Sequence, residues 1–109
     1  MTMAKYKVLL VCAAGMSSSL LEAAAIKAAE KRGHELDIHA ISAPQVGIYD
    51  FAVDPVDMVL IGPQVRYKRK SIKKMAEPLG IVVDVIDSIT YGMVDGDKLF
   101  DQIVQGVPR

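Results

Sequence analysis

Four short β-rich runs, each followed by a segment typical of a helix, constrain the fold of this chain more than any other feature of its sequence. The runs span Tyr6–Val11, Glu35–Ile41, Met58–Ile61 and Ile81–Ile86. Strands that alternate with helices form a parallel sheet, because right-handed crossovers then place the helices on both of its faces. We therefore expect a doubly wound α/β fold in a single domain, residues 1–109, with its core at about residues 5–105.

The segments between the strands have helical signals of unequal strength. The expected helices are Ser17–Arg32, Pro44–Phe51, Val65–Glu77 and a last one that begins at Asp95 or Asp97 and ends at Gln105. The first is rich in alanine and leucine and ends before Gly33, a residue typical of helix C-termini. The second is the weakest prediction, because Gly47 interrupts it.

The chemistry of the strands predicts their order in the sheet. Val8–Val11 and Met58–Ile61 contain no polar residue, so both are expected to be buried at the centre. The strands that carry Glu35 and Asp84 are expected at the edges. The expected order is therefore 2-1-3-4, which reverses between strands 1 and 3. Ligands of doubly wound sheets bind at such a reversal, beyond the carboxyl ends of the strands, where the loops after strands 1 and 3 should meet.

The loop after the first strand begins with Cys12 and continues with small and hydroxyl-bearing residues. The candidate phosphate-binding residues are Ala13, Ala14, Gly15, Met16, Ser17, Ser18 and Ser19. Backbone amides in such a turn, and at the start of the helix that follows, carry partial positive charge that stabilises a bound phosphate and favours a thiolate. The loop therefore predicts a nucleophilic Cys12 beside a phosphate cradle. The structural alternative is a buried cysteine next to a serine-capped helix.

Other phosphate-binding chemistries do not fit the spacing of this loop. A nucleotide-binding P-loop needs a second glycine followed by a lysine, but the first lysine after Cys12 is Lys27, so no nucleotide or other cofactor is expected. Low-molecular-weight tyrosine phosphatases share the expected topology and carry an arginine six residues after the cysteine, where this chain has Ser18. Without a guanidinium on the phosphoryl oxygens, we expect a phosphocysteine to hydrolyse slowly enough to be handed on.

The composition excludes several other classes of protein. Cys12 is the only cysteine, so no internal disulfide can form and a reducing compartment is favoured. The formal net charge is zero, which gives no overall attraction to nucleic acids. No apolar stretch reaches the ~20 residues that a membrane span needs, and His34 and His39 lack the spacing of metal ligands. We expect a cytoplasmic domain without a metal, a nucleic-acid partner or a membrane insertion.

A basic segment follows the third strand. Its cations are Arg66, Lys68, Arg69, Lys70, Lys73 and Lys74, six of the 13 in the chain. The turn before this segment should lie beside the Cys12 loop, and its charges are suited to steer an acidic partner. The residues at which we expect partners to dock are Gly62, Pro63, Gln64, Lys68 and Arg69. The alternative is a solvated helix face with no partner.

Three motifs stand in a characteristic order and spacing. They are LVCAAGMSSSLL at residues 10–21, IGPQV at 61–65 and VIDSITYG at 85–92. Together they resemble the enzyme IIB component of the bacterial phosphoenolpyruvate-dependent sugar phosphotransferase system, lactose/cellobiose (chitobiose) family. Ser18 stands where many members have threonine and keeps the hydroxyl, whereas residues 44–57 depart more from the family.

The resemblance implies a function as a phosphoryl carrier. Cys12 would accept a phosphoryl group from a phosphohistidine of the IIA component and pass it to a sugar such as cellobiose, chitobiose or lactose, bound by the membrane IIC component. The domain would then reach the inner face of the membrane only through IIC. Two alternatives use the same loop: a non-catalytic domain that senses phosphate or a thiol oxidant, and a low-molecular-weight phosphatase-like hydrolase.

Overall fold

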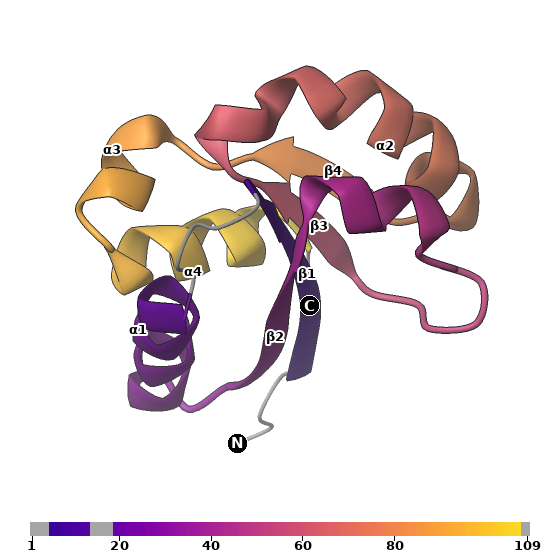
Figure 1. Cartoon of the computed structure of the whole chain (residues 1–109). Coiled ribbons are helices and arrows are strands. Elements are labelled where there is room, and N and C mark those ends of the chain that lie inside the picture. The colour runs from indigo at the N-terminus through magenta and orange to yellow at the C-terminus, as the bar shows by residue number, and fades with distance from the viewer. Residues whose placement is uncertain (1–4, 14–18, 108–109) are drawn as a thin grey trace.

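The expected strands form one parallel sheet in the computed structural model, which describes residues 5–13 and 19–107 (Figure 1). The strands are β1 (Lys5–Cys12), β2 (Glu35–Ser42), β3 (Met58–Ile61) and β4 (Val82–Val85). Their order is β2-β1-β3-β4, and all three pairings are parallel, so the predicted order is confirmed. The apolar strands β1 and β3 occupy the centre, and every residue in 8–11 and 58–61 is buried.

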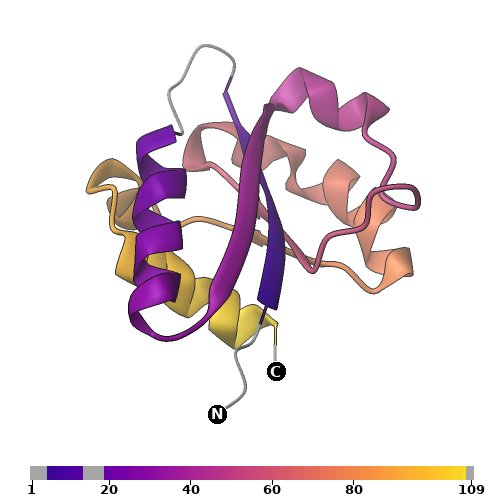
Figure 2. The ribbon, with the colours of Figure 1, turned by 90° about the horizontal axis from the view of Figure 1, so that it is seen from below.

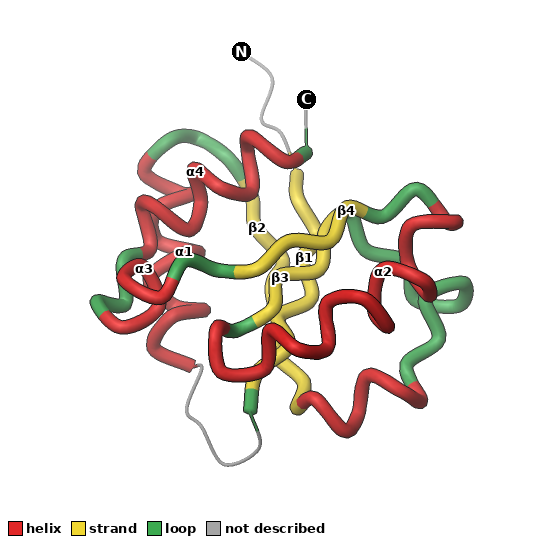
Figure 3. Tube along the Cα trace, turned by 90° about the horizontal axis from the view of Figure 1, so that it is seen from above, coloured by secondary structure: helices red, strands yellow, loops and turns green. Residues whose placement is uncertain are grey.

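Helices and 3₁₀ helices, the latter labelled η, connect the strands and follow the last of them. They are α1 (Ser19–Lys31), η1 (Ala43–Ile48), η2 (Pro63–Lys68), α2 (Arg69–Ala76), η3 (Glu77–Leu79), α3 (Ser88–Gly92) and α4 (Gly96–Gly106). Helices α1, α3 and α4 lie on one side of the sheet, and η1 and α2 lie on the other (Figures 1 and 3). The prediction of a doubly wound fold with helices on both faces is therefore confirmed.

Alternate residues of the central strands supply two separate cores. One core joins Val8, Leu10, Met58 and Leu60 to Leu21, Ala25, Ala28, Leu99, Phe100 and Ile103 of α1 and α4. The other joins Leu9, Val11, Val59 and Ile61 to Val46, Val65, Ile72 and Ala76 of η1, η2 and α2. Each fully buried Val or Leu side chain contributes ~1.5–3 kcal/mol. The sheet is therefore held from both sides, and the end of β1 has a defined place between the two helical layers (Figure 2).

The segment expected as a helix at Pro44–Phe51 is the shorter 3₁₀ helix η1. Its start is fixed by a capping box, in which the Ser42 amide donates to Gln45 Oε1 at 2.7 Å. Its end precedes a turn at Asp50, whose carboxylate accepts from the amides of Ala52 and Val53. Such local hydrogen bonds from Asp compete with helix continuation, so the chain turns before a longer helix can form.

The segment expected as one helix at Val65–Glu77 is divided into η2, α2 and η3. Val65 has non-helical dihedrals (φ −122°, ψ 24°), and its side chain is buried in the core beside η1 and α2. Pro78 lies at the start of η3 and has no amide proton to donate, which is incompatible with a continuing α-helix. The sequence therefore predicted the correct region for this helix and missed its kinks.

Two aspartates begin the last two helices. Asp95 caps α4, because its side chain accepts from the Lys98 amide at 3.1 Å, which confirms one of the two predicted starts. Asp87 caps α3 by accepting from the amides of Ile89 and Thr90. This five-residue helix was not predicted from the sequence, since it is too short to show helical periodicity.

Hydrogen bonds and an ion pair join the segment before β3 to the amino end of β1. Lys7 Nζ lies 2.7 Å from Asp54 Oδ1, and the Lys7 amide donates to Asp57 Oδ2 at 2.8 Å. The Tyr49 hydroxyl donates to the Asp54 carbonyl oxygen at 2.8 Å. These contacts lie at the start of β1, at the end of the sheet opposite to Cys12.

We expect Asp54→Asn to lower stability at neutral pH and to lose this deficit in acid. The hydrogen bond from Lys7 holds the pKa of Asp54 below its ordinary value of 3.8, and the nearby Tyr49 hydroxyl lowers it further. Because the pKa is lower in the folded state, the carboxylate stabilises the fold above the unfolded-state value, and this contribution disappears as the pH falls through the folded-state pKa. Urea unfolding of both proteins from neutral to acidic pH measures the difference. A deficit that persists unchanged in acid would contradict this role.

Candidate functional site

The carboxyl ends of β1 and β3 meet as predicted. Cys12 is the last residue of β1, and Gly62 follows β3 directly. The Gly62 amide donates to the Val11 carbonyl oxygen at 2.7 Å, so the turn after β3 is bonded to the residue before Cys12. A Cβ built on Gly62 would lie 3.4 Å from the same oxygen. The hydrogen bond therefore joins the two loops at the point where the strand order reverses.

The Cys12 thiol is held at the end of the central strand. The residue is 5% exposed, and its Sγ donates to the Ile41 carbonyl oxygen at 3.6 Å. Its register partner in β2 is Ser42. The thiol forms no disulfide. The pairing of β1 with β2 and this weak hydrogen bond hold it in place.

Only the two ends of the predicted phosphate cradle belong to the described residues. Ala13 is half-buried against the core that contains Val11 and Ile61, and Ser19 begins α1. The predicted cradle residues Ala14, Gly15, Met16, Ser17 and Ser18 lie outside the described residues. The loop thus connects the carboxyl end of a central strand to the start of a helix, which is the arrangement that phosphate-binding loops use.

The residues predicted to dock partners line the other loop of this end. Gly62 is buried, Pro63 and Lys68 are half-buried, and Gln64 and Arg69 are exposed. A shallow depression of ≈ 470 Å³ is lined by Pro63, Gln64, Arg66 and Tyr67. Predicted docking residues and basic residues therefore share one surface directly after β3.

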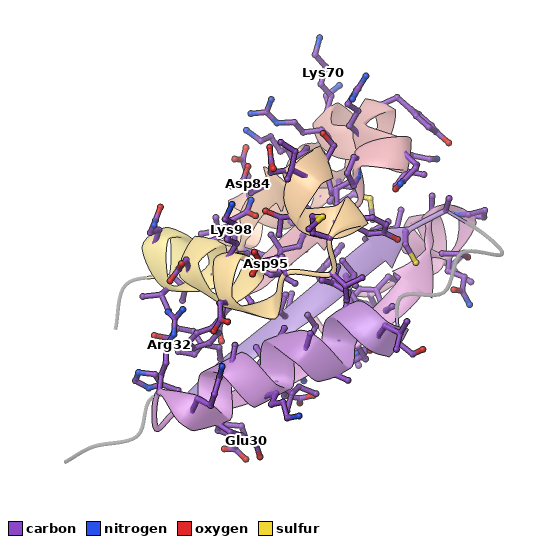
Figure 4. All side chains as sticks on the ribbon, turned by 90° about the vertical axis from the view of Figure 1, so that its left-hand side faces the viewer. Glu30, Arg32, Lys70, Asp84, Asp95 and Lys98 are labelled. Atoms are coloured by element: carbon purple, nitrogen blue, oxygen red, sulfur yellow. The ribbon has the colours of Figure 1, made fainter. Side chains whose placement is uncertain are left out.

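The basic segment is mostly free of acidic neighbours. Lys73 lies 3.8 Å from Glu77, and the other five cations of the segment form no ion pair among the described residues. Figure 4 shows Lys70 projecting away from α2 and from the rest of the domain. An exposed and unpaired cluster of like charge is suited to attract an acidic surface.

Tyr91 is a residue of this end that the sequence analysis did not single out. It belongs to α3, and Tyr91 Cε2 lies 3.6 Å from a Cβ built on Gly62. Burial raises the pKa of the Tyr91 phenol, and the negative charge of Cys12 as a thiolate raises it further. Tyr91 was part of the third motif, but only the tertiary packing of α3 places it beside the other two loops.

Two further properties concern only the described residues. In residues 5–13 and 19–107 no group of three or more His, Cys, Asp or Glu side chains is placed to hold a metal ion. Within the same ranges, no helix has both the length and the apolar character required to cross a membrane.

The chain matches one family model over most of its length. The model is described as "PTS system, Lactose/Cellobiose specific IIB subunit" and matches residues 7–102. The oligo-beta-mannoside-specific EIIB component of Bacillus subtilis (strain 168) is 38% identical over 96 residues, which cover 88% of this chain and 90% of the relative. The cellobiose-specific EIIB component of Lactococcus lactis subsp. lactis (strain IL1403) is 38% identical over 99 residues, covering 89% and 92%.

Solved structures agree with these matches. The cellobiose-specific phosphotransferase IIB component from Borrelia burgdorferi superposes with a TM-score of 0.71 at 32% identity, covering 94% of this chain and 92% of that chain. The lactose-specific IIB component domain from Streptococcus pneumoniae has a TM-score of 0.76 at 23% identity, with coverage of 94% and 97%. The second likeness supports the fold alone, and the first supports fold and family together.

Proposed function

We propose the chemistry of this chain from one premise: the chain belongs to the lactose/cellobiose-specific IIB subunit family of the PTS, the phosphoenolpyruvate:carbohydrate phosphotransferase system, whose model spans residues 7–102. EIIB components are phosphotransferases, so the chain is a phosphotransferase of a sugar phosphotransferase system. The proposal concerns the nucleophile, the donor and the acceptor.

The proposed nucleophile is Cys12, which accepts a phosphoryl group from a phosphohistidine of the IIA component. The Cys12 thiolate attacks phosphorus in line, so an S–P bond forms as the N–P bond breaks. The imidazole leaves with the electron pair of that bond and is neutral when its other ring nitrogen carries a proton. The observation that carries this assignment is the position of Cys12, the only thiol of the chain, at the carboxyl end of β1 where the strand order reverses.

The proposed acceptor is a hydroxyl of a sugar bound by the membrane IIC component. Its oxygen attacks the phosphocysteine, the S–P bond breaks, and sulfur leaves as the thiolate, which restores Cys12. A base supplied by IIC takes the proton of the hydroxyl. Relatives named for oligo-beta-mannoside and cellobiose support a β-linked sugar such as cellobiose, chitobiose or lactose. In this function the domain is cytoplasmic and reaches the membrane through IIC.

The proposed cradle for the phosphoryl group consists of the backbone amides of residues 13–19 and the hydroxyls of Ser17, Ser18 and Ser19. Amides at a helix start stabilise a phosphate without a cationic side chain. The absence of arginine at position 18 favours a carrier over a hydrolase, because no guanidinium stabilises the charge of the hydrolytic transition state.

The test is to phosphorylate the chain with phosphoenolpyruvate and the upstream carriers and to map the label by digestion. We expect a phosphoryl group on Cys12 that persists without acceptor and moves to the sugar when IIC is added. Rapid release of inorganic phosphate would favour the phosphatase-like alternative. No labelling by an active IIA component would favour the sensing alternative.

We also propose that the turn and basic segment after β3 dock the IIA component. Lys68→Glu combined with Arg69→Glu is then expected to slow transfer from IIA about tenfold at low salt, since charge steering acts on the association rate. The effect should shrink at physiological ionic strength, where charges are screened over about 8 Å. The measurement is the bimolecular transfer rate as a function of salt concentration.

The matched control changes the same net charge at the opposite end of the sheet. Lys5→Glu with Lys31→Glu removes two exposed cations, which lie 4.0 Å from Glu35 and 3.8 Å from Asp97, and such exposed pairs contribute little. The control should transfer at the normal rate. Equal rates for the docking variant and wild type at low salt would assign the basic segment to a solvated helix face.

A further inference from the structure

Tyr91 has a polar group that the proposed mechanism does not use. Among the described residues, its hydroxyl is the only buried side-chain nitrogen or oxygen without a hydrogen-bond partner. Burying a hydroxyl without a partner destabilises a protein, so native structures avoid it. An unpaired buried hydroxyl therefore requires an explanation. One explanation is a ligand that supplies the missing hydrogen-bond acceptor.

The Tyr91 side chain lies at the carboxyl end of the central strands. Its ring packs against the core formed with α1 and α4. The ring edge lies beside Gly62, 3.6 Å from a Cβ built there. Gly62 is in turn bonded to Val11, the residue before Cys12. Thus α3, the turn after β3 and the end of β1 converge on one point.

Electrostatics also connect Tyr91 with Cys12. Burial raises the pKa of the phenol, and the negative charge of a Cys12 thiolate raises it further. A phenol with the ordinary pKa of 10.0 is already protonated at neutral pH and a raised pKa keeps it so, which leaves Tyr91 able to donate a hydrogen bond to an anion at Cys12.

We propose that the Tyr91 hydroxyl donates a hydrogen bond to the phosphoryl group carried by Cys12. The inference rests on the proposed function, because it requires a phosphocysteine at position 12. A phosphoryl group has three acceptor oxygens and a negative charge, and hydrogen bonds to charged acceptors are stronger than those between neutral groups. The phenol adds one donor without the positive charge of the arginine found in phosphatases. Tyr91 thus stabilises the phosphorylated state at the expense of the unphosphorylated one.

The first test is the thermal stability of unphosphorylated Tyr91→Phe. This variant removes the unpaired oxygen and keeps the ring, so we expect its Tm to rise by about 4 °C. Tyr49→Phe is the matched control, because the Tyr49 hydroxyl does have a partner, the Asp54 carbonyl oxygen at 2.8 Å. The same chemical change should therefore lower the Tm of the control. A lower Tm for Tyr91→Phe would overturn the proposal and give the hydroxyl a structural role.

The second test uses the phosphorylated proteins. Without the Tyr91 donor, the equilibrium between phosphorylated IIA and phosphorylated Cys12 should shift about tenfold toward IIA, which corresponds to ~1.4 kcal/mol. The apparent pKa of the phosphoryl group, followed by phosphorus NMR, should rise, because its dianion loses a hydrogen bond. Tyr49→Phe lies at the other end of the sheet and should match wild type in both measurements.

The two tests separate this inference from the proposed function. If wild-type Cys12 is phosphorylated and Tyr91→Phe has the same equilibrium and phosphoryl pKa as wild type, the inference is overturned and the carrier function stands. If wild-type Cys12 accepts no phosphoryl group from an active IIA component, the proposed function fails and the inference fails with it.

Discussion

Cys12→Ser is expected to abolish phosphoryl transfer to this chain, with a loss of about 10³-fold or more. The nucleophile in the proposed reaction is a thiolate, whereas a serine hydroxyl keeps its proton at neutral pH and is a poor nucleophile without an adjacent base. The measurement is incorporation of label from phosphoenolpyruvate through the upstream carriers, followed over time for the variant and wild type.

The variant should fold like wild type. Cys12 is almost fully buried, and its thiol donates to the Ile41 carbonyl oxygen at 3.6 Å. A serine hydroxyl is smaller and can donate to the same oxygen, so loss of transfer would not follow from loss of structure. His39→Gln is the functional control and should be labelled at the normal rate. Undiminished labelling of Cys12→Ser, or label mapped to His34 or His39, would overturn the assignment of the nucleophile.

The central strands of the sheet could be predicted because the composition of each short segment already indicates its burial. Val8–Val11 and Met58–Ile61 contain no polar residue, and only central positions in a parallel sheet bury both faces of a strand. That requirement places β1 and β3 at the centre, as in the observed order β2-β1-β3-β4. The order then places Cys12 and Gly62 at the same end, and the hydrogen bond from the Gly62 amide to Val11 confirms that the two loops are neighbours.

The features that were missed depend on contacts distant in sequence or on very short elements. Helix α3 is set by a single cap, Asp87, and has too few residues for a periodic pattern. The kink lies in the dihedral angles of one residue, Val65, which the spacing of apolar residues does not show. Tyr91 lies beside Gly62 only through packing of α3, so no spacing rule identifies it. The roles of Ala14 to Ser18 stay predictions of the sequence.

Gly96→Ala is expected to lower the free energy of unfolding by about 3 kcal/mol or more. Gly96 begins α4 where this helix crosses α1, and an added Cβ would overlap the Ala24 backbone carbonyl and lie 2.8 Å from Ala24 Cβ. Neither neighbour is the flexible end of a side chain, so α4 has to move away from α1. This shift would also pull Phe100, fully buried in the core, away from its neighbours.

Gly47→Ala is the matched control for this substitution. A Cβ at Gly47 meets nothing within 4 Å, and its backbone does not need glycine, so its stability should stay within ~0.5 kcal/mol of wild type. Urea unfolding compares the three proteins. Equal stability of Gly96→Ala and wild type would mean that α4 can move away from Ala24 without disturbing Phe100. The close crossing of α1 and α4 would then not determine the stability of this face of the sheet.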